Sequence, residues 1–331
     1  MQIKQNTRHP CTITINEGII LKNELPDGFV ITDSNLAAKY GDLIGEHPHY
    51  VMKAGEASKS LRTYELVHRE LEHFRGRAIG FGGGVVTDVA GLAAGELVLD
   101  LVLVPTSLTA MVDAAIGGKN GINRDGIKNA IRKMHQPSEV ITDTLFLQTL
   151  PIKEFKNGIA EVIKYHDIFN SPAREIILPE VINKNLEKII CNCILNKVKI
   201  VEQDEEDKGI RHCLNFGHTF GHAFELLYNL NHGEAISIGM AYEDVLGKKL
   251  GYRKENNLKY LLKSHGLPLN LPCNIDMDKV IEIMKHDKKG AFVFAFSRDN
   301  YNIQLDERTI REFLASSTIL KNKIPPPVPE N

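Results

Sequence analysis

The amino-acid sequence predicts an α/β domain with a parallel sheet, followed by a helical domain. Before residue 150, short runs of β-branched and aromatic residues alternate with helical stretches, and this alternation favours a parallel sheet. After Pro151 the apolar residues recur at the helical period over longer stretches. We therefore expect two domains, residues 1–150 and residues 151–331.

The main elements follow from local patterns in chain order. Three short apolar runs predict buried strands, namely Gly28–Thr32, Arg77–Phe81 and Leu101–Val104. Between the first two, the apolar spacing from residue 61 to residue 74 predicts an amphipathic helix. Further helices are expected over residues 186–201 and 258–264, and the proline-rich stretch 324–329 predicts a solvated polyproline II tail.

Composition excludes several classes of function. The chain has 331 residues, of which 43% are hydrophobic and 25% charged, values typical of a globular protein. A net charge of −2 argues against broad nucleic-acid binding. The apolar stretch 85–104 contains Asp88, Glu96 and Asp100, which argues against a membrane span. The start resembles no secretory signal and the five cysteines have no zinc or disulfide spacing, so we expect a cytoplasmic protein.

A glycine run follows the strand that ends at Phe81. In Gly82-Gly83-Gly84 the backbone amides can approach a pyrophosphate at the start of a helix, although tight turns also use glycine triplets and the run is not G-x-G-x-x-G. Lys119 and Lys128 lie near further glycines. Exposed lysines are usually surface residues, but this setting indicates contact with a phosphate or carboxylate.

Four polar residues in the second half have the spacing of one helix face. Arg211, Asn215, His218 and His222 are separated by four, three and four residues. The residues between them are mostly apolar, so a helix here would be buried on its other faces. Such a polar stripe is costly unless it binds something. We therefore expect it to form a wall of the active site.

A metal site is indicated by histidines and a carboxylate in separate segments. His232 follows the stripe and Glu161 precedes it, and a catalytic zinc takes three protein ligands with one position open. His218 and His222, four residues apart, could both bind metal as in zincins, but the expected glutamate beside the first histidine is absent. Spacing alone therefore leaves the ligand set open.

Several blocks, in order and at matching spacing, resemble the 3-dehydroquinate synthases of the sugar-phosphate cyclase superfamily. The match runs from about Asp33-Ser34-Asn35 to Asp287-Lys288-Lys289. Its blocks are Gly55–Lys59, Gly82–Gly91, Pro105–Leu108, Val112-Asp113, Gly117–Lys119, Lys128-Asn129, Gln136-Pro137, Asn157–Lys164, Leu214–His222 and His232–Glu234.

This resemblance implies a Rossmann-like NAD-binding domain, an all-α domain that binds a divalent metal, and an active site in the cleft between them. The metal is usually zinc, with cobalt as an alternative, and its ligands would be Glu161, His218 and His232. The residues that match NAD contacts are Asp33, Asn35, Glu56, Lys59, Gly84, Val85, Val86, Thr87, Asp88, Thr106, Ser107, Phe146, Leu147, Gln148 and Thr149, with Asp113, Lys119 and Lys128 at the junction of cofactor and substrate.

The resemblance also implies a substrate, 3-deoxy-D-arabino-heptulosonate 7-phosphate, and a step of the shikimate pathway to the aromatic amino acids. It implies a homodimer. His222 is then a substrate residue instead of a metal ligand. The other residues assigned to catalysis or substrate are Lys119, Asn129, Lys164, Lys197, Arg211, Asn215 and one or both of Lys288 and Lys289.

The chain departs from the family pattern in two places. Thr87 stands where the family has glycine before the aspartate of the glycine-rich loop. The family usually has an Arg-Gly pair that contacts phosphate across the dimer, but Gly95–Asp100 fills that region without arginine. A lost charged hydrogen bond costs about 1.5–3 kcal/mol, and Arg124, Arg132 or Lys133 are the candidates to replace it.

The sequence leaves three functions open. The first is 3-dehydroquinate synthase, which Arg211 and Lys197 favour because cyclases without a carboxylate substrate tend to replace them. The second is another cyclase of the inosose or valiolone type, which would turn over glucose 6-phosphate or sedoheptulose 7-phosphate. The third is an NAD- and metal-dependent polyol dehydrogenase or an inactive paralogue. Net accumulation of NADH would indicate the dehydrogenase, because a cyclase recycles its cofactor.

Overall fold

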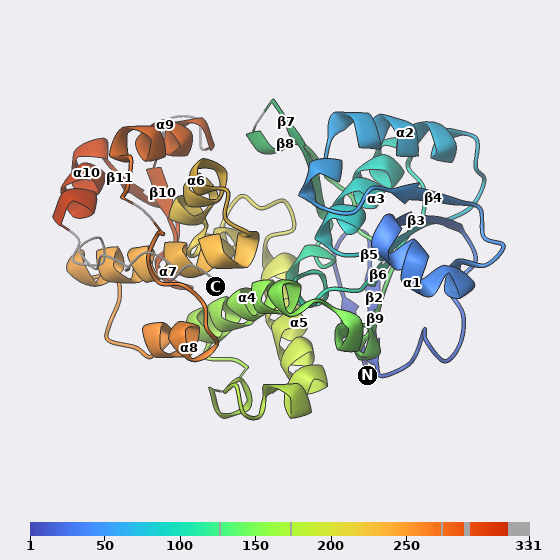
Figure 1. Ribbon diagram of the computed structural model, residues 1–331, viewed down its shortest axis with the longest axis horizontal. Helices are drawn as coiled ribbons and strands as arrows, with labels where there is room; N and C mark the ends of the chain where they lie inside the picture. The colour runs from blue at the N-terminus through green and yellow to red at the C-terminus, as the bar shows by residue number, and fades with distance from the viewer. Residues whose placement is uncertain (126, 173, 273, 288–291, 317–331) are drawn as a thin grey trace, which may run out of the picture.

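A seven-stranded sheet forms the centre of the amino-terminal domain (Figure 1). The computed structural model describes residues 1–125, 127–172, 174–272, 274–287 and 292–316. The strand order is β1-β2-β9-β6-β5-β3-β4, with β1 and β2 antiparallel and the other pairs parallel. The strands are β1 (Gln2–Gln5), β2 (Cys11–Asn16), β3 (Phe29–Asp33), β4 (His49–Met52), β5 (Ala78–Gly82), β6 (Leu101–Pro105) and β9 (Glu139–Asp143).

The parallel strands are connected by helices, as the alternating pattern predicts. Helix α1 (Ser34–Ile44) lies on one side of the sheet, and α2 (Leu61–Glu72) and α3 (Gly84–Leu97) lie on the other (Figure 1). Because α3 is covered both by the sheet and by other elements, residues 86–95 are all buried. The three strands predicted from sequence correspond to β3, β5 and β6, each within one residue at either end.

A β-hairpin extends from this domain toward the second one. Strands β7 (Lys119–Arg124) and β8 (Ile127–Met134) pair only with each other, apart from an isolated bridge between Ser60 and Asn123, within the described residues. In Figure 1 the hairpin stands between the two domains. It carries both lysines that the glycine-rich surroundings single out, Lys119 and Lys128.

The second half of the chain is largely helical, which confirms the predicted character of this domain. Its helices are α4 (Ile152–Phe169), α5 (Leu186–Gln203), α6 (His218–Tyr228), α7 (His232–Lys249), α8 (Leu258–Ser264), α9 (Met277–Asp287) and α10 (Glu307–Ser316). The expectation of a purely helical domain needs one correction, because β10 (Phe292–Phe294) and β11 (Ile303–Leu305) form a small antiparallel sheet. Its aromatic residues complete a core with Phe220, Phe224 and Phe313.

The boundary that we propose between residues 150 and 151 falls just before α4. A 3₁₀ helix, η3 (Thr144–Thr149), closes the first domain. The helices predicted over residues 186–201 and 258–264 begin where expected, at Leu186 and Leu258.

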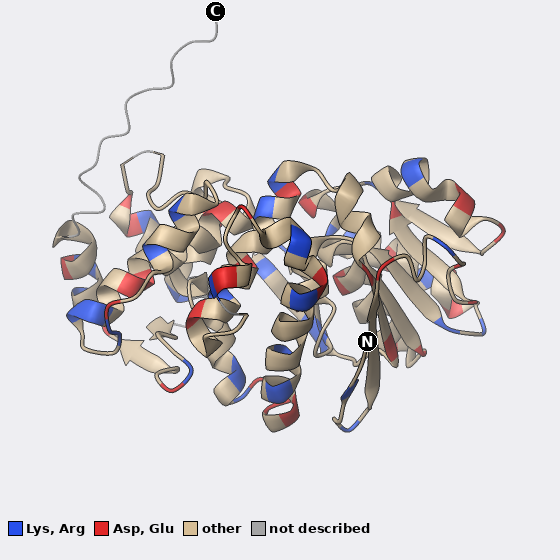
Figure 2. Ribbon diagram, turned by 90° about the horizontal axis from the view of Figure 1, so that it is seen from below, with Lys and Arg blue, Asp and Glu red and all other residues tan. Residues whose placement is uncertain are grey.

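Basic and acidic residues are interspersed along both domains (Figure 2). Among the described helices, none combines the length and apolar character that a bilayer span requires. The predicted proline-rich tail lies outside the described residues.

Candidate active site

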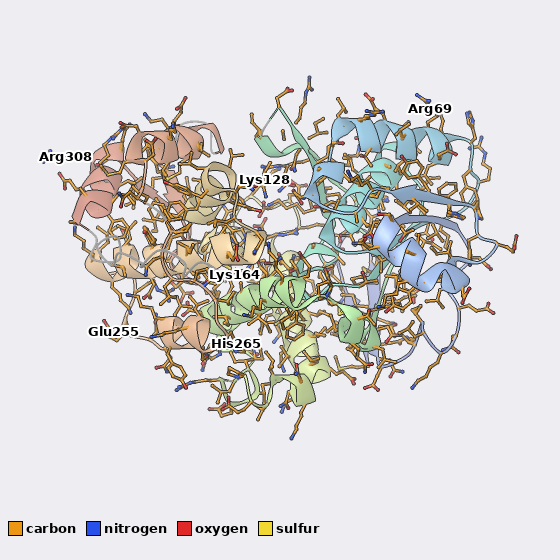
Figure 3. The ribbon with its side chains drawn as sticks, in the orientation of Figure 1. Arg69, Lys128, Lys164, Glu255, His265 and Arg308 are labelled. Carbon is orange, nitrogen blue, oxygen red and sulfur yellow. The ribbon has the colours of Figure 1, made fainter. Side chains whose placement is uncertain are left out.

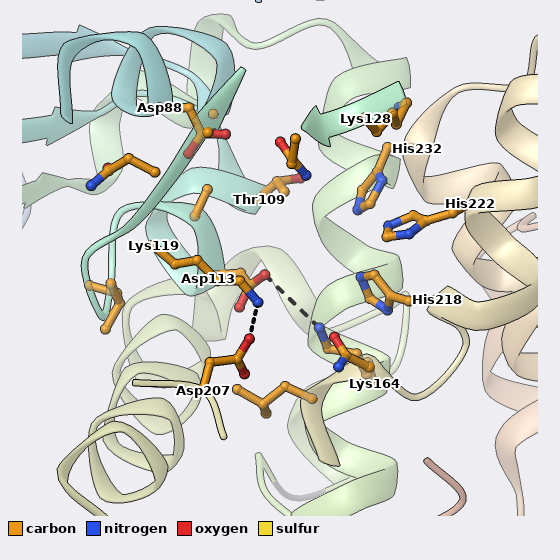
Figure 4. Close-up of a pocket in the computed structure, with 18 of the residues that line it drawn as sticks. Asp88, Thr109, Asp113, Lys119, Lys128, Lys164, Asp207, His218, His222 and His232 are labelled. Carbon is orange, nitrogen blue, oxygen red and sulfur yellow. Dashed lines mark hydrogen bonds and ion pairs between the residues drawn. The ribbon is translucent and has the colours of Figure 1, made fainter. Parts of the chain in front are cut away.

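A cavity of about 610 Å³ lies between the two domains. Figure 3 shows Lys128 and Lys164 in the middle of the molecule, far from peripheral residues such as Arg69 and Arg308. Many of the residues predicted for the site line it, and the close-up in Figure 4 shows ten side chains by name. The predicted residues that line it are Glu56, Lys59, Gly84, Val85, Asp88, Ser107, Asp113, Lys119, Lys128, Asn129, Lys164, Lys197, Arg211, Asn215, His218, His222 and His232.

The residues predicted to contact NAD gather at the carboxyl edge of the parallel sheet. Asp33 ends β3, Gly82 ends the adjacent β5, and Thr106 directly follows β6. The chain moves from β3 to β4 in one direction and to β5 in the other, so the strand order reverses at this point. In open α/β sheets, ligands bind in the crevice outside such a reversal.

Not every residue of this group reaches the cavity. The Asp33 carboxylate caps α1 by accepting hydrogen bonds from the backbone N–H groups of Asn35 and Leu36. The ring of Phe146 is buried against Tyr40 and Phe81. Of the other predicted cofactor residues, none of the following lines the cavity: Asn35, Val86, Thr87, Thr106, Leu147, Gln148 and Thr149.

The glycine-rich connection is shaped by close packing around the start of α3. A Cβ atom on Gly82 would lie 2.5 Å from Val86 Cγ2, so the turn requires glycine there. Asp88, one turn into α3, forms an ion pair with Lys59. Burial raises the pKa of Asp88 despite the attraction of Lys59. Thr87 is buried in the helix and its hydroxyl donates to the Gly84 carbonyl, so the departure from the family pattern is satisfied locally.

Asp113 is the meeting point of two buried lysines. Its carboxylate lies 2.5 Å from Lys197 Nζ and 4.0 Å from Lys164 Nζ, and it accepts a hydrogen bond of 2.8 Å from the Tyr165 hydroxyl. Burial opposes ionisation, but attraction by Lys164 and Lys197 outweighs it and lowers the pKa of Asp113. Burial, reinforced by repulsion from Arg211, lowers the pKa of Lys197 to about 8.

Glu161, His218 and His232 converge on one point; both histidines line the cavity, whereas Glu161 is buried beside it and does not. Their candidate ligand atoms all lie within 4.8 Å of one another. Glu161 Oε1 is 3.1 Å from His232 Nε2 and 3.7 Å from His218 Nε2, and Lys164 holds the other carboxylate oxygen at 2.5 Å. One carboxylate and two imidazoles form the donor set of a three-ligand catalytic zinc site.

In each imidazole, the Nδ1 atom, which does not face Glu161, lies near a hydrogen-bond acceptor that orients the ring. His218 Nδ1 lies 3.1 Å from the Phe216 carbonyl oxygen, and His232 Nδ1 lies 3.4 Å from Glu225 Oε2. With a proton on Nδ1, each ring keeps the lone pair of Nε2 for a metal. These residues therefore fit a divalent metal.

The pKa values of the three residues are shifted in different directions by burial and by neighbouring charges. Burial opposes ionisation of Glu161, but Lys164 and a hydrogen bond from His232 lower its pKa to about 2. Burial and repulsion by Lys164 lower the pKa of His218 well below its usual value. For His232 burial is outweighed by Glu161 and Glu225, which raise its pKa to about 9.

The expectation that the polar stripe lies on one helix is wrong. Arg211 and Asn215 belong to a 3₁₀ helix, η6 (Ile210–Asn215), whereas His218 and His222 belong to α6. Gly217 separates the two with φ of 82°, a left-handed conformation that favours glycine. All four side chains nevertheless line the same cavity.

Other cavity residues were not predicted from sequence. Asn157, Asp207, His212 and Glu225 all line it (Figure 4 labels Asp207). Asp207 and Glu225 pair with lysines 88 and 97 residues away, so short-range spacing carries no signal for them.

Some remaining candidates lie away from the cavity or outside the described chain. Arg132, a candidate for the missing phosphate contact, lines the cavity, whereas Arg124 and Lys133 do not. Lys288 and Lys289 lie outside the described residues.

Comparisons with known proteins show the family of this chain. Two family models match, "3-dehydroquinate synthase N-terminal" over residues 49–157 and "3-dehydroquinate synthase C-terminal" over residues 158–290. The 3-dehydroquinate synthase of Saccharolobus solfataricus is 43% identical over 256 residues, which cover 71% of this chain and 72% of that protein.

Two solved structures show the same fold. The first is 2-deoxy-scyllo-inosose synthase complexed with carbaglucose-6-phosphate, NAD⁺ and Co²⁺, with a TM-score of 0.79, 23% identity, and coverage of 95% of this chain and 99% of that one. The second is 2-epi-5-epi-valiolone synthase from Streptomyces hygroscopicus with NAD⁺ and Zn²⁺ bound, with a TM-score of 0.76, 24% identity, and coverage of 92% and 95%. Since the two family models together span residues 49–290 and the sequence relative covers more than two thirds of the chain, the chain belongs to the 3-dehydroquinate synthase family.

Proposed function

We propose that the cavity between the two domains is the site at which this protein converts 3-deoxy-D-arabino-heptulosonate 7-phosphate into 3-dehydroquinate and phosphate. The activity itself, that of a carbon–oxygen lyase, follows from the family. The observation that supports this site best is that the two walls of the cavity offer different binding groups. One wall is the carboxyl edge of a parallel sheet, and the other holds a three-ligand metal set beside buried cations.

We propose NAD and one divalent metal, most simply zinc, as the cofactors. Glu161, His218 and His232 would hold the metal, and the end of β5 with the start of α3 would hold the dinucleotide phosphates. When bound, the nicotinamide supplies reversible oxidation of a substrate hydroxyl and the metal polarises neighbouring hydroxyl oxygens.

The residues of the chain itself would bind and orient the two anionic groups of the substrate. Arg211 and Lys197 lie close enough for their charges to repel and lower the pKa of Lys197, so a carboxylate between them would relieve that repulsion. On the other side of the cavity, Lys119 and Lys128 extend from the hairpin next to Asn129. Cations and amides at this density suit a phosphate.

The proton on Lys164 would keep Glu161 ionised and aligned. Its Nζ lies 2.5 Å from Glu161 Oε2 and 4.0 Å from Asp113 Oδ2, and its side chain is buried. Neutralising it would leave two buried carboxylates without their shared cation, which costs several kcal/mol in typical cases, on the order of 3–5. Lys164 therefore orients the Glu161 carboxylate of the metal site, while its neighbours hold the substrate.

The decisive experiment is incubation of the protein with the heptulosonate phosphate, NAD and zinc, with phosphate and 3-dehydroquinate measured together. We expect the two products in equal amounts and no net NADH, because the oxidation is reversed within each turnover. Net NADH with a polyol, or turnover of glucose 6-phosphate or sedoheptulose 7-phosphate in its place, would assign the cavity to another reaction. We also propose a cytoplasmic homodimer, and light scattering of the purified protein tests the oligomeric state.

A further inference from the structure

Glu225 connects the metal-binding residues of one domain to the hairpin of the other. It lies on α6, and its side chain is almost fully buried, with 8% exposed. Its Oε2 is 3.4 Å from His232 Nδ1, and its Oε1 accepts a hydrogen bond from the Lys128 ammonium. Figure 4 shows His232 and Lys128 next to each other at one end of the cavity.

We propose that Glu225 is a positioning residue that couples metal binding at His232 to docking of the β7–β8 hairpin through Lys128. The inference rests on the metal site under the proposed function and adds to it a residue that holds no metal itself. It also makes the hairpin and the metal site parts of one energetically coupled unit.

The Glu225 carboxylate orients the His232 imidazole. The ring is flanked by two carboxylates, Glu225 at Nδ1 and Glu161 at Nε2. Glu225 fixes the rotation of the ring about its axis, so Nε2 is presented to the same point as the Glu161 carboxylate and His218. Carboxylates in this relation to a ligating histidine raise metal affinity, and their loss typically weakens it about 10- to 100-fold.

The same carboxylate holds Lys128 of the hairpin. The hairpin packs on α3 of its own domain, and the Lys128–Glu225 pair adds a contact across the cavity to the other domain. A second such contact links Lys119 to Asp207. Both lysines are therefore held across the cavity by carboxylates of the other domain, but only Glu225 also contacts a metal-binding histidine.

Reciprocity follows from this shared carboxylate. If metal binding orders His232, and His232 in turn orders Glu225, the ion pair between Glu225 and Lys128 becomes stronger. By thermodynamic linkage, Lys128 must then strengthen metal binding by the same factor. The Lys119–Asp207 pair offers a matched control, since it crosses the same cavity from the same hairpin without touching Glu161, His218 or His232.

The test is a double-mutant cycle on zinc affinity, measured by competition with a chromophoric chelator in the absence of substrate. We expect Glu225→Gln to raise the zinc Kd about 10- to 100-fold and Lys128→Met to raise it about 2- to 10-fold. The double variant should be weaker than wild type by less than the product of the two effects, because both changes break one chain of contacts. Asp207→Asn and Lys119→Met should leave the zinc Kd unchanged.

Three results separate the possible failures. If the wild-type protein binds no stoichiometric zinc, the proposed metal site is wrong. If it binds zinc but Glu225→Gln does so within twofold of wild type, the role of Glu225 is wrong and the metal site stands. If the effects of Glu225→Gln and Lys128→Met on the zinc Kd multiply in the double variant, Glu225 orients His232 but the coupling to the hairpin is absent. Circular dichroism of each metal-free variant shows whether it has folded, and Glu225→Asp replaces Glu225→Gln if that variant has not.

Discussion

Lys197 donates two hydrogen bonds to Asp113, one to the carboxylate at 2.5 Å and one to the backbone carbonyl at 2.6 Å. Burial and the nearby Arg211 nevertheless lower the pKa of Lys197 to about 8. The lysine is charged below this pH and neutral above it. We predict that kcat/KM for the heptulosonate phosphate falls as pH rises through about 8, because a charged contact with the substrate carboxylate is lost.

Lys197→Arg provides the control for this pH dependence. A guanidinium stays protonated throughout the accessible range, so the fall in kcat/KM should move to higher pH even if the maximum activity is lower. An unchanged alkaline limb in the arginine variant would assign the titration to another group. The pH dependence of kcat alone separates this effect from one on the chemical step.

Local sequence patterns predicted three strands of the seven-stranded sheet and helix α2 of the first domain, but not β1, β2, β4, β9 or the hairpin. The short apolar runs of β3, β5 and β6 form buried strands. Gly82 marks the connection from β5 to α3, because a Cβ atom there would collide with Val86. The second domain was predicted only in outline. The small sheet of β10 and β11 consists of three-residue strands, too short for a periodic pattern to identify.

The polar stripe shows why spacing was insufficient at the site. Offsets of four, three and four fit an unbroken helix, but Glu243 on α7 accepts backbone hydrogen bonds from Gly217, Thr219 and Phe220 and so starts a new helix there. That carboxylate is distant in sequence. Likewise, the roles of Glu225 and Asp207 depend on lysines of the other domain, which no local pattern reveals.

The metal site is tested by single substitutions of its three ligands. Alanine at Glu161, His218 or His232 should remove stoichiometric zinc and activity, because two remaining ligands hold zinc too weakly. His265→Ala is the control, since His265 is bonded through Nε2 to the Ile177 carbonyl at 2.7 Å and does not line the cavity. Zinc content is measured by elemental analysis after gel filtration. Full zinc content in the His232→Ala protein would contradict the assignment.

Carboxylate recognition is tested at Arg211. The side chain is buried, with 4% exposed, and one guanidinium nitrogen donates to the Glu205 carbonyl at 3.0 Å, so Arg211 is not a solvated surface residue. We predict that Arg211→Ala lowers kcat/KM roughly 10- to 100-fold, mainly through KM, which matches about 1.5–3 kcal/mol for a charged contact.

Zinc content and NAD affinity give the controls for Arg211→Ala. Neither should change, because Arg211 contacts neither the three metal ligands nor the edge of the sheet in the described structure. Wild-type efficiency of the variant with the heptulosonate phosphate would show that the carboxylate binds elsewhere. In that event the cyclases that act on substrates without a carboxylate would become the better interpretation of the cavity.

The contact between α6 and α7 depends on a glycine. A Cβ atom on Gly239 would lie 1.9 Å from the Gly217 carbonyl oxygen and 2.8 Å from the Gly221 nitrogen, so α7 touches the backbone of the very turn that begins α6. No flexible side chain can move aside there. Gly239→Ala must push the helices apart and should lower the free energy of unfolding by about 3 kcal/mol or more, at the upper end of overpacking effects.

The same displacement should reach the metal site, because His218 is the first residue of α6 and His232 the first of α7. Folded Gly239→Ala protein should therefore also bind zinc more weakly. Gly41→Ala is the matched control: a Cβ atom on Gly41 of α1 would meet no atom within 4 Å, and alanine should stabilise the helix by about 0.5–1 kcal/mol. Urea unfolding measures both changes. Equal stability of Gly239→Ala and wild type would mean that the two helices can separate freely, and that the position of His218 does not depend on their contact.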